Sequence, residues 1–327
     1  MTLLLHESDV RKLLTMPLAL DAVEESLRRL AAGEAILHPR RRIEIPGKAF
    51  LHYMAAADTA SGYMGLKIYT WVQATLRFVV LLYRVETGEL AALVEADYLG
   101  QMRTGAASGV ATKYMAQADA HSASIIGTGL QARTQLEAIC AVRKIESIRA
   151  FGRDPERRAA FCKEMSARLA VPVEAAASAE EAVRGADIVV AATTAQRPVV
   201  HGAWLAPGAH VNAIGANFPQ KRELDDEAVA RAARIAVDSL EQSKYEAGDL
   251  IQAFANDPEK WASVGELGDI VAGKRSGRGD ASEITLFKSN GIAIWDIAVA
   301  ARVYELAAKR GVGEQISLWE AERKRGS

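Results

Sequence analysis

The stretch that decides the fold of this chain is Ser124-Ile125-Ile126-Gly127-Thr128-Gly129-Leu130-Gln131-Ala132, in which a short apolar strand runs directly into a glycine-rich turn and a helical pattern. It has the G-x-G-x-x-A form of the dinucleotide fingerprint. Gly127 permits the tight turn, Gly129 lets the backbone approach a pyrophosphate closely, and Ala132 keeps the helix near the strand. The N-terminus of that helix offers free N–H groups to the phosphates. The stretch therefore predicts a bound nicotinamide or flavin dinucleotide.

From about residue 120 onward the chain alternates strand and helix patterns, which favours a doubly wound parallel sheet of the Rossmann type. A capping box at Ser178 precedes one helix, and another helix is expected to begin near Glu223. The strands predicted after the glycine turn are 147–152, 187–192, 209–215, 235–238 and 284–287.

In the N-terminal part the predicted strands follow one another without helices between them, which is typical of an antiparallel or mixed sheet. We expect Ser8 to cap a short helix, a longer helix from Pro17 to about Ala32, and a small-residue helix over 104–116 that can pack closely against a neighbour. A last helix over 292–310 is expected to return to this part. The predicted strands are 41–45, 50–55, 64–69, 78–83 and 90–95. The predicted domains are 1–116 with 292–327, and 117–291 for the Rossmann dinucleotide-binding domain.

Composition excludes several classes of protein. The 327 residues carry a formal net charge of −1, so neither nucleic acid nor an anionic membrane is expected as a partner. The longest apolar run, Phe78–Tyr83, is too short to span a bilayer, and Met1–Leu5 is followed at once by polar residues, unlike a signal peptide. Cys140 and Cys162 have no metal-ligand spacing, and no metal is predicted. We expect a soluble cytoplasmic protein.

Further motifs extend along nearly the whole chain and make it resemble one family. In order, they are Gly65-Leu66-Lys67, Glu86-Thr87-Gly88-Glu89-Leu90, Met102-Arg103-Thr104-Gly105-Ala106-Ala107, Val211-Asn212-Ala213-Ile214-Gly215-Ala216, Lys221-Arg222-Glu223-Leu224-Asp225 and Gly265-Glu266-Leu267-Gly268. With this ordered set the chain resembles the ornithine cyclodeaminase/mu-crystallin family. The resemblance implies a Rossmann domain plus a mixed α/β dimerisation and substrate domain, a homodimer, a nicotinamide cofactor, and chemistry at the α-carbon of an amino acid or its imine.

The resemblance also implies a substrate site. An α-imino acid carries a carboxylate, so its site needs cations that hold it beside the nicotinamide. Arg40, Lys67 and Arg103 match family positions that do this. Lys67 and Arg103 stand among apolar and small residues, where an unpaired charge would be costly. Arg41 and Arg42 flank Arg40, so the register there is open by one or two residues.

The cofactor side is assigned by the fingerprint and by matching family positions. These residues are Thr75, Arg103, Thr104, Gly127, Thr128, Gly129, Leu130, Gln131, Thr193, Ile214, Gly215, Ala216, Lys221 and Ser289, with Asn290 facing cofactor and substrate. An NAD site usually presents an acid at the end of the second strand. Here that strand ends Phe151-Gly152-Arg153-Asp154, and Arg153 with Arg157 could bind a 2′-phosphate. NADP(H) is therefore predicted, with NAD(H) as the alternative because Asp154 is adjacent.

Two departures from ornithine cyclodeaminases bear on the reaction. Those enzymes carry an aspartate where this chain has Asn217, and an amide cannot serve as a general base. They carry a glutamate near the position of His52, which could instead donate a proton to an imine nitrogen, unless it is structural. The predicted function is a reductase of α-imino acids, or an amino-acid dehydrogenase in reverse, with Lys67, His52 or a water as the proton source.

Two alternatives remain open at this stage. One is a true ornithine cyclodeaminase, and the other is a non-catalytic binding protein like mu-crystallin. The aromatic residues Tyr53, Tyr69, Trp71 and Phe218 either line an apolar substrate pocket or belong to the core.

Overall fold

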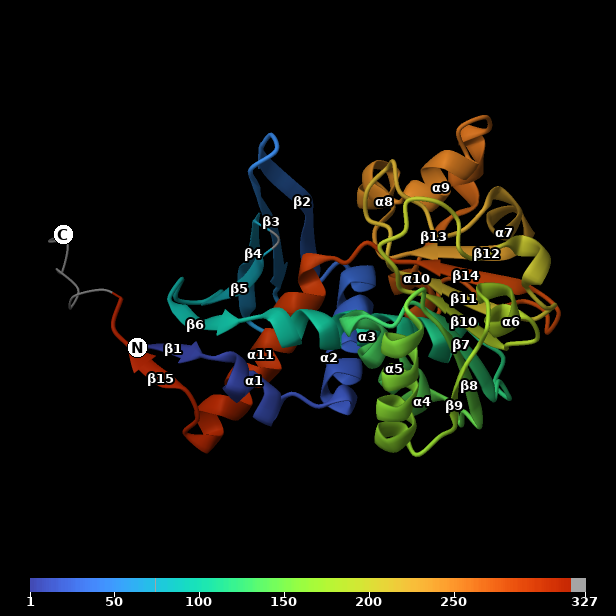
Figure 1. The fold of residues 1–327 in the computed structure, drawn as a ribbon. Coiled ribbons are helices and arrows are strands. Elements are labelled where there is room, and N and C mark those ends of the chain that lie inside the picture. The colour runs from blue at the N-terminus through green and yellow to red at the C-terminus, as the bar shows by residue number, and fades with distance from the viewer. Residues whose placement is uncertain (74, 319–327) are drawn as a thin grey trace, which may run out of the picture.

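The computed structural model describes residues 1–73 and 75–318, and it contains two separate β-sheets. Figure 1 shows the seven-stranded sheet on the left, the eight-stranded sheet on the right, and helices α2 (Met16–Ala32), α3 (Asp97–Met115) and α11 (Ala293–Arg310) between them. A three-layer arrangement of this kind gives each sheet a helical cover for one apolar face. Among the described residues, no helix is long and apolar enough to cross a membrane.

The seven-stranded sheet is mixed, as predicted. Its strands lie in the order β15-β1-β6-β5-β4-β3-β2; only β1 and β6 pair in parallel, and all other neighbours are antiparallel. The strands β15 and β1 have three and four residues, too few for a sequence pattern to reveal them. The bounds are β1 Thr2–Leu5, β2 Ala35–Ile45, β3 Ala49–Asp58, β4 Tyr63–Val72, β5 Thr75–Arg84, β6 Leu90–Glu95 and β15 Glu314–Ile316.

Capping residues explain where the helices of this half begin and end. Thr15 caps α2, Pro17 lies in its first turn, and Gly33 ends it in the left-handed conformation. The short helix α1 spans Glu7–Leu13 with His6 as its N-cap, so the prediction that Ser8 caps it is wrong: Ser8 lies inside the first turn. The long helix α11 packs on β2, β3, β4 and β5, which returns the late chain to the first sheet as predicted.

The eight-stranded sheet is parallel throughout, in the order β13-β12-β14-β11-β10-β7-β8-β9, which confirms the doubly wound Rossmann prediction. One helix start differs from the prediction: the helix expected near Glu223 begins at Asp226, because Asp225 accepts the N–H of Ala228 at 2.8 Å and caps it. The strands are β7 Ser122–Ile126, β8 Ser147–Phe151, β9 Val173–Ala175, β10 Ile188–Ala191, β11 His210–Ala213, β12 Ala232–Val237, β13 Gly265–Glu266 and β14 Ile284–Lys288. The helices are α4 Leu130–Val142, α5 Pro155–Leu169, α6 Ala179–Val183, α7 Asp226–Arg231, α8 Leu240–Glu246, α9 Gly248–Ala253 and α10 Leu267–Val271, with short 3₁₀ helices at Gly202–Trp204 and Pro258–Ser263.

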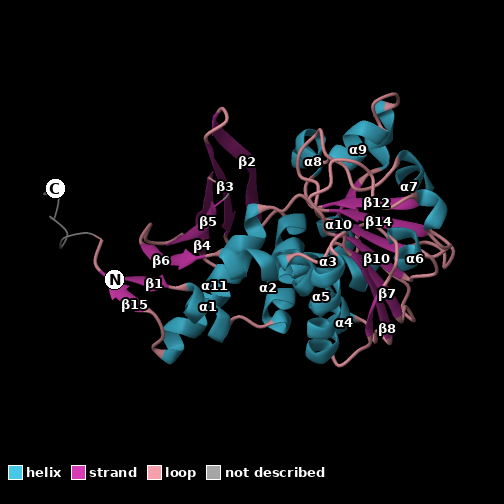
Figure 2. Cartoon of the chain, in the orientation of Figure 1, coloured by secondary structure: helices cyan, strands magenta, loops and turns pink. Residues whose placement is uncertain are grey.

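The two halves are joined by close packing of α3 against α4. A Cβ atom at Gly105 would lie 2.4 Å from the backbone oxygen of Thr134, so only glycine allows this approach. Figure 2 shows that the turn joining β2 and β3 projects beyond the helices, on the side of α8.

We propose the domain division that the sequence suggests, with residues 1–116 and 292–327 in one domain and 117–291 in the other. Residues 319–327 lie outside the described residues.

Candidate active site

The glycine turn after β7 has the geometry that a dinucleotide needs. Gly127 has φ +108°, and a Cβ there would lie 2.3 Å from the carbonyl oxygen of Ala192, so no other residue fits. Gly129 is the N-cap of α4, and a Cβ there would meet nothing within 4 Å. Leu130 is 62% exposed at the start of the helix, and the amide oxygen of Gln131 is buried without a hydrogen-bond partner among the described residues. These observations fit a bound dinucleotide.

A buried carboxylate supports two neighbouring loops at the carboxyl edge of the parallel sheet. Glu223 is fully buried and accepts the N–H and hydroxyl of Thr193, at 2.6 and 2.7 Å, with one oxygen. Its other oxygen accepts the N–H of Gly215 at 2.6 Å. Thr193 follows β10 and Gly215 follows β11, so one side chain fixes both loops that the family resemblance assigns to the cofactor.

Two further buried charges complete this support. Lys288, at the end of β14, donates to the backbone oxygen of Ala216 at 2.5 Å and lies 3.1 Å from the carboxylate of Asp249. Asp249 accepts the backbone N–H groups of Glu223 and Leu224 at 2.6 and 2.8 Å. Lys288 and Asp249 are both fully buried. The cluster of Glu223, Asp249 and Lys288 carries net charge −1 when all three are ionised.

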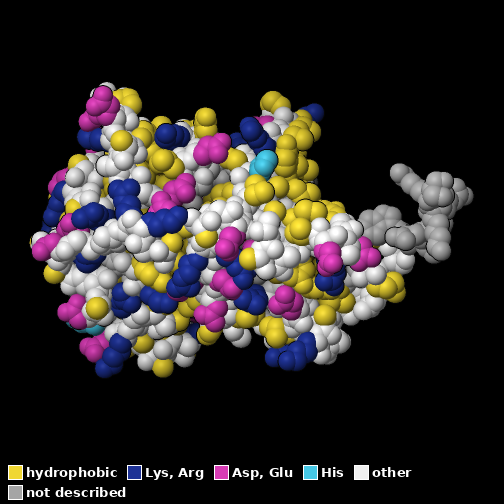
Figure 3. Space-filling model, turned by 180° about the vertical axis from the view of Figure 1, so that it is seen from behind, with side chains coloured by type: hydrophobic (Ala, Val, Ile, Leu, Met, Phe, Trp, Pro, Cys, Tyr) yellow, Lys and Arg dark blue, Asp and Glu magenta, His cyan; other side chains and the backbone are white. Residues whose placement is uncertain are grey.

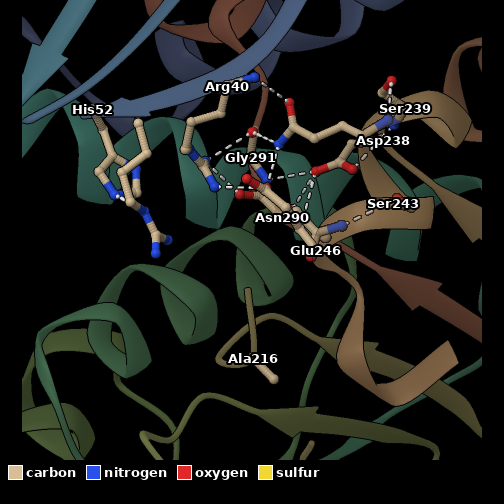
Figure 4. A network of polar contacts seen from close by, with 12 residues as sticks. Arg40, His52, Ala216, Asp238, Ser239, Ser243, Glu246, Asn290 and Gly291 are labelled. Atoms are coloured by element: carbon tan, nitrogen blue, oxygen red, sulfur yellow. Dashed lines mark hydrogen bonds and ion pairs between the residues drawn. The ribbon is translucent and has the colours of Figure 1, made fainter. Parts of the chain in front are cut away.

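The turn after β14 is held by a second carboxylate, Asp238, at the end of β12. One of its oxygens accepts the hydroxyl of Ser289 at 3.0 Å and the N–H groups of Asn290 and Gly291 at 2.7 and 2.6 Å. Figure 4 shows this turn beside Arg40, with Ala216 on a loop nearby. The side-chain oxygen of Asn290 is buried without a partner among the described residues, so the turn presents one free acceptor.

Arg40 connects the two halves of the molecule at this turn. Its guanidinium donates to the carboxylate of Glu246 at 2.7 Å and to the carbonyl oxygens of Asn290 and Gly291 at 2.8 and 3.2 Å. The side chain is only 5% exposed. The structure thus gives Arg40 protein acceptors, in addition to the predicted substrate carboxylate, and makes it a bridge from β2 to α8 and β14.

Lys67 and Arg103 share a counter-ion that sequence reasoning missed. The ammonium of Lys67 and the Nε of Arg103 donate to the same oxygen of Asp296, at 2.7 and 3.0 Å. Asp296 is fully buried at the start of α11, and its other oxygen has no partner among the described residues. Two cations against one carboxylate leave one positive charge, which suits the carboxylate of a small acid.

The environment makes Lys67 easier to deprotonate than an ordinary lysine. Burial lowers its pKa to about 8 from 10.5; the charge of Arg103 adds to the lowering, and Asp296 opposes it. Lys67 remains protonated at neutral pH but loses its proton within the mildly alkaline range.

His52 lies in a hydrogen-bonded row across three strands. Its Nε2 accepts the Nε–H of Arg42 at 2.8 Å, and its Nδ1 lies 2.9 Å from the hydroxyl of Tyr69. Burial, with the charges of Arg42 and Arg40, lowers the pKa of His52 to about 3. A neutral imidazole holds a single, very weakly acidic N–H, and both nitrogens of His52 are already hydrogen-bonded, so the structure does not support His52 as the proton donor.

The remaining predicted residues differ in their contacts and in their exposure. The hydroxyl of Thr104 donates a hydrogen bond to the carbonyl oxygen of Gly100 at 2.7 Å, within its own helix. Gly152 packs against Thr128, since a Cβ there would lie 2.7 Å from its hydroxyl oxygen. The others are Thr75, Arg153 and Arg157, which are exposed, and Ile214, Asn217 and Lys221, which are partly exposed on or after the β11 loop.

Several charged residues of the site were not singled out from the sequence. Three of them carry a signal in hindsight, because each is an ionisable residue within or at the end of an apolar run: Asp238, Lys288 and Asp296. Such a residue must find a buried partner. Glu246 carries no such signal, since it lies in a short polar helix, and Asp249 lies in a helix of only six residues, too short to show a clear pattern.

The fold and the turn at Gly127 define the class of the protein: a Rossmann-type dinucleotide-binding protein with a second, mixed-sheet domain. Residues 1–311 match the family model of the ornithine cyclodeaminase/mu-crystallin family, and the chain belongs to that family. This confirms the resemblance seen in the sequence motifs.

Individual relatives agree with the family assignment. A Delta(1)-pyrroline-2-carboxylate reductase of Bacillus cereus is 41% identical over 261 residues, which cover 77% of this chain and 80% of that protein. The structure of Thermococcus litoralis Delta(1)-pyrroline-2-carboxylate reductase in complex with NADH and L-proline is 38% identical, with TM-score 0.92, over 96% of this chain and 100% of that one. An archaeal alanine dehydrogenase dimer with bound NAD is 36% identical, with TM-score 0.91, over 97% and 99%.

Proposed function

We propose that this protein is a nicotinamide-dependent reductase of α-imino acids. The observation that carries the proposal is the buried pair Lys67 and Arg103 with its single counter-ion Asp296, which retains one positive charge for a substrate carboxylate. The similar proteins named above act in that class, as reductases of a cyclic imine or as an amino-acid dehydrogenase. A reduced nicotinamide cofactor would supply the hydride. The chain's own residues would hold the carboxylate and supply a proton.

A cyclodeaminase is the second candidate, and the residues disfavour it. The position that needs a carboxylate is Asn217, and His52, which stands where ornithine's ammonium would need an acid, is neutral and bonded to Arg42. A general base contributes about 10²–10⁴-fold to the rate, and an amide forfeits that contribution. A purely binding role is disfavoured by the cost of burying two cations that a structural protein does not need.

For the cofactor, we propose a preference for NADP(H) over NAD(H). Arg153 and Arg157 are exposed beyond β8, where they could contact a 2′-phosphate, and Arg157 lies 3.6 Å from the carboxylate of Asp154. Asp154, the acid that could instead bind a ribose hydroxyl, is occupied as the N-cap of α5 and accepts the N–H of Arg157 at 3.0 Å. A titration in which NADH binds tenfold more tightly than NADPH would reverse this assignment.

We also propose a homodimer formed through the outer face of β2–β5. Figure 3 shows hydrophobic side chains gathered over these strands, and the exposed ones on the outer face are Ile36, Ile43, Ile45, Tyr53, Met64 and Val72. A hollow of about 470 Å³ on this face is lined mainly by apolar atoms, among them those of Ile36, Met64 and Leu66. An apolar face of this extent favours a second copy of the chain as its binding partner.

For localisation we propose the cytoplasm, where the thiols of Cys140 and Cys162 would stay free of disulfide bonds.

The test is a turnover assay with purified protein. Cofactor absorbance at 340 nm is followed with Δ1-pyrroline-2-carboxylate, with a six-membered cyclic imino acid, and with pyruvate plus ammonia as a source of a linear imine. We expect absorbance to fall with at least one imine and no ammonia to appear from ornithine. Steady release of proline and ammonia from ornithine would establish the cyclodeaminase instead. The absence of turnover on all substrates, with cofactor still bound, would favour the binding protein.

A further inference from the structure

One row of side chains crosses the inner face of the mixed sheet beside the candidate site. Arg42 of β2 stands opposite His52 of β3, His52 opposite Tyr69 of β4, and Tyr69 opposite Phe78 of β5. Directly opposite residues in an antiparallel pair place their side chains in contact. The register therefore accounts for the hydrogen bonds from Arg42 to His52 and between His52 and Tyr69, and for the stacking of Tyr69 on Phe78 with ring centres 5.1 Å apart.

The donors and acceptors in this row fix the position of every proton. The guanidinium of Arg42 can only donate, so Nε2 of His52 must be the acceptor. A neutral imidazole with Nε2 unprotonated carries its proton on Nδ1, and that proton is donated to the oxygen of Tyr69. The hydroxyl proton of Tyr69 is then directed elsewhere. Within residues 1–73 and 75–318 it has no acceptor, so the phenol is an available donor.

Tyr69 stands next to the cations that would hold the substrate. It is two residues from Lys67 on the same face of β4, and the Lys67 ammonium lies 5.3 Å from the centre of the same Phe78 ring on which Tyr69 stacks. The charged groups that act on Tyr69 come from every side: Arg42 beyond His52, Arg40 from β2, Arg103 from α3 and Glu246 from α8. The available phenol proton and the carboxylate-holding pair thus share one part of the site.

We propose that Tyr69 is the general acid of the reduction and that His52 and Arg42 are its positioning residues; the inference rests on the proposed imine reductase function. As the α-carbon accepts a hydride from reduced nicotinamide, the π electrons of the C=N bond move to nitrogen. Nitrogen forms its new N–H bond with the phenolic proton of Tyr69, and the O–H bond breaks. The resulting phenolate accepts the Nδ1–H of His52 and later regains a proton from water.

The other candidates for this step are occupied. Lys67 donates to Asp296 and is needed at the substrate carboxylate, and both nitrogens of His52 are bonded. Burial raises the pKa of Tyr69, offset in part by Arg40, which keeps the phenol protonated in the range where the enzyme would work.

The first measurement is of binding, with no reaction. Picolinate resembles a cyclic imino acid, with an acceptor nitrogen beside the carboxylate, and benzoate lacks that nitrogen. Tyr69→Phe removes only the hydroxyl, and Tyr245→Phe, at a 71% exposed position of α8, is the matched control. With oxidised cofactor present, calorimetry should show picolinate bound about tenfold more weakly by Tyr69→Phe, with benzoate unchanged. Equal weakening of both ligands would indicate a merely structural role and overturn the proposal.

The second measurement is the pH profile of imine reduction. Above the pKa of the free imine, Tyr69→Phe should lose about 10²–10⁴-fold in kcat/KM, because it can use only imine already protonated by water. The loss should grow tenfold with each pH unit. An N-methyl iminium carboxylate needs no proton and should be reduced equally by both proteins. Parallel pH profiles of wild type and Tyr69→Phe would refute the role of Tyr69, whereas inactivity of the wild type with every imine would refute the reductase function itself.

Discussion

The substitution Lys67→Met should make the fold more stable while it removes activity. Methionine keeps the length of the buried stem and deletes the charge, and Asp296 retains Arg103 as its partner at 3.0 Å. The pKa of Lys67 falls from 10.5 to about 8, a lowering of about 2.5. At 1.36 kcal/mol for each unit of pKa, holding this ammonium inside the protein costs about 3 kcal/mol of folding free energy.

The sign of the effect can be checked against pH. Between pH 8 and 10.5 the unfolded chain holds a proton on Lys67 that the folded protein has released, so the stability of the wild type rises with pH in this window. Below pH 8 both states hold the proton and the full cost applies. Lys67→Met lacks this dependence, so its advantage should be constant below pH 8 and should vanish by about pH 10.5.

Thermal unfolding of the protein without ligand measures this difference. A chain of 327 residues shifts by roughly 1.5 °C per kcal/mol, so Lys67→Met should unfold about 4 °C higher at pH 7. Imine reduction should fall about 10- to 100-fold from the loss of a charged hydrogen bond to the substrate. Lys163→Met, at an exposed position of α5, is the control and should change neither property. A lower melting temperature for Lys67→Met would show that the pair with Asp296 is net stabilising and refute the reasoning.

Three further substitutions test other parts of the structure. Glu223→Gln keeps the shape of the side chain but places an N–H₂ group against the N–H donors of Thr193 or Gly215. It should weaken the binding of reduced cofactor tenfold or more in a fluorescence titration, and unchanged affinity would show that these two loops do not bind the cofactor. Gly127→Ala should abolish cofactor binding, because its Cβ would lie 2.3 Å from the oxygen of Ala192, and retained affinity would contradict the assigned turn. Ile43→Glu should convert a dimer to a monomer in light scattering, and a wild type with the mass of one chain would refute the dimer directly.

The sequence revealed the parallel sheet and the cationic residues because both leave local signals. The glycine turn at 127–132 lies within a few residues, and Lys67 and Arg103 stand out as charges among apolar neighbours. Their counter-ion could not be found in this way, since Asp296 lies 229 residues from Lys67 in the chain and only the docking of α11 brings them together.

The arginine cluster of β2 shows why register is hard to predict. Strict alternation would place Arg40 and Arg42 together and His38 with them, but the pairing of β2 with β3 shifts between His38 and Arg41. The irregularity leaves Arg42 opposite His52 and lets Arg40 reach Glu246 in the other half. The proton arrangement of His52 depends on this cross-strand register, which no pattern along the chain contains.

The late position of α11 has a consequence for the order in which the molecule is made. Strands β7 to β11 are synthesised well before Asp296, so this part of the parallel sheet can form while the first sheet still lacks its central helix. Until then the charges of Lys67 and Arg103 have no buried carboxylate to join, and burying them is unfavourable. The first sheet can therefore bury these two cations against Asp296 only after α11 has been synthesised.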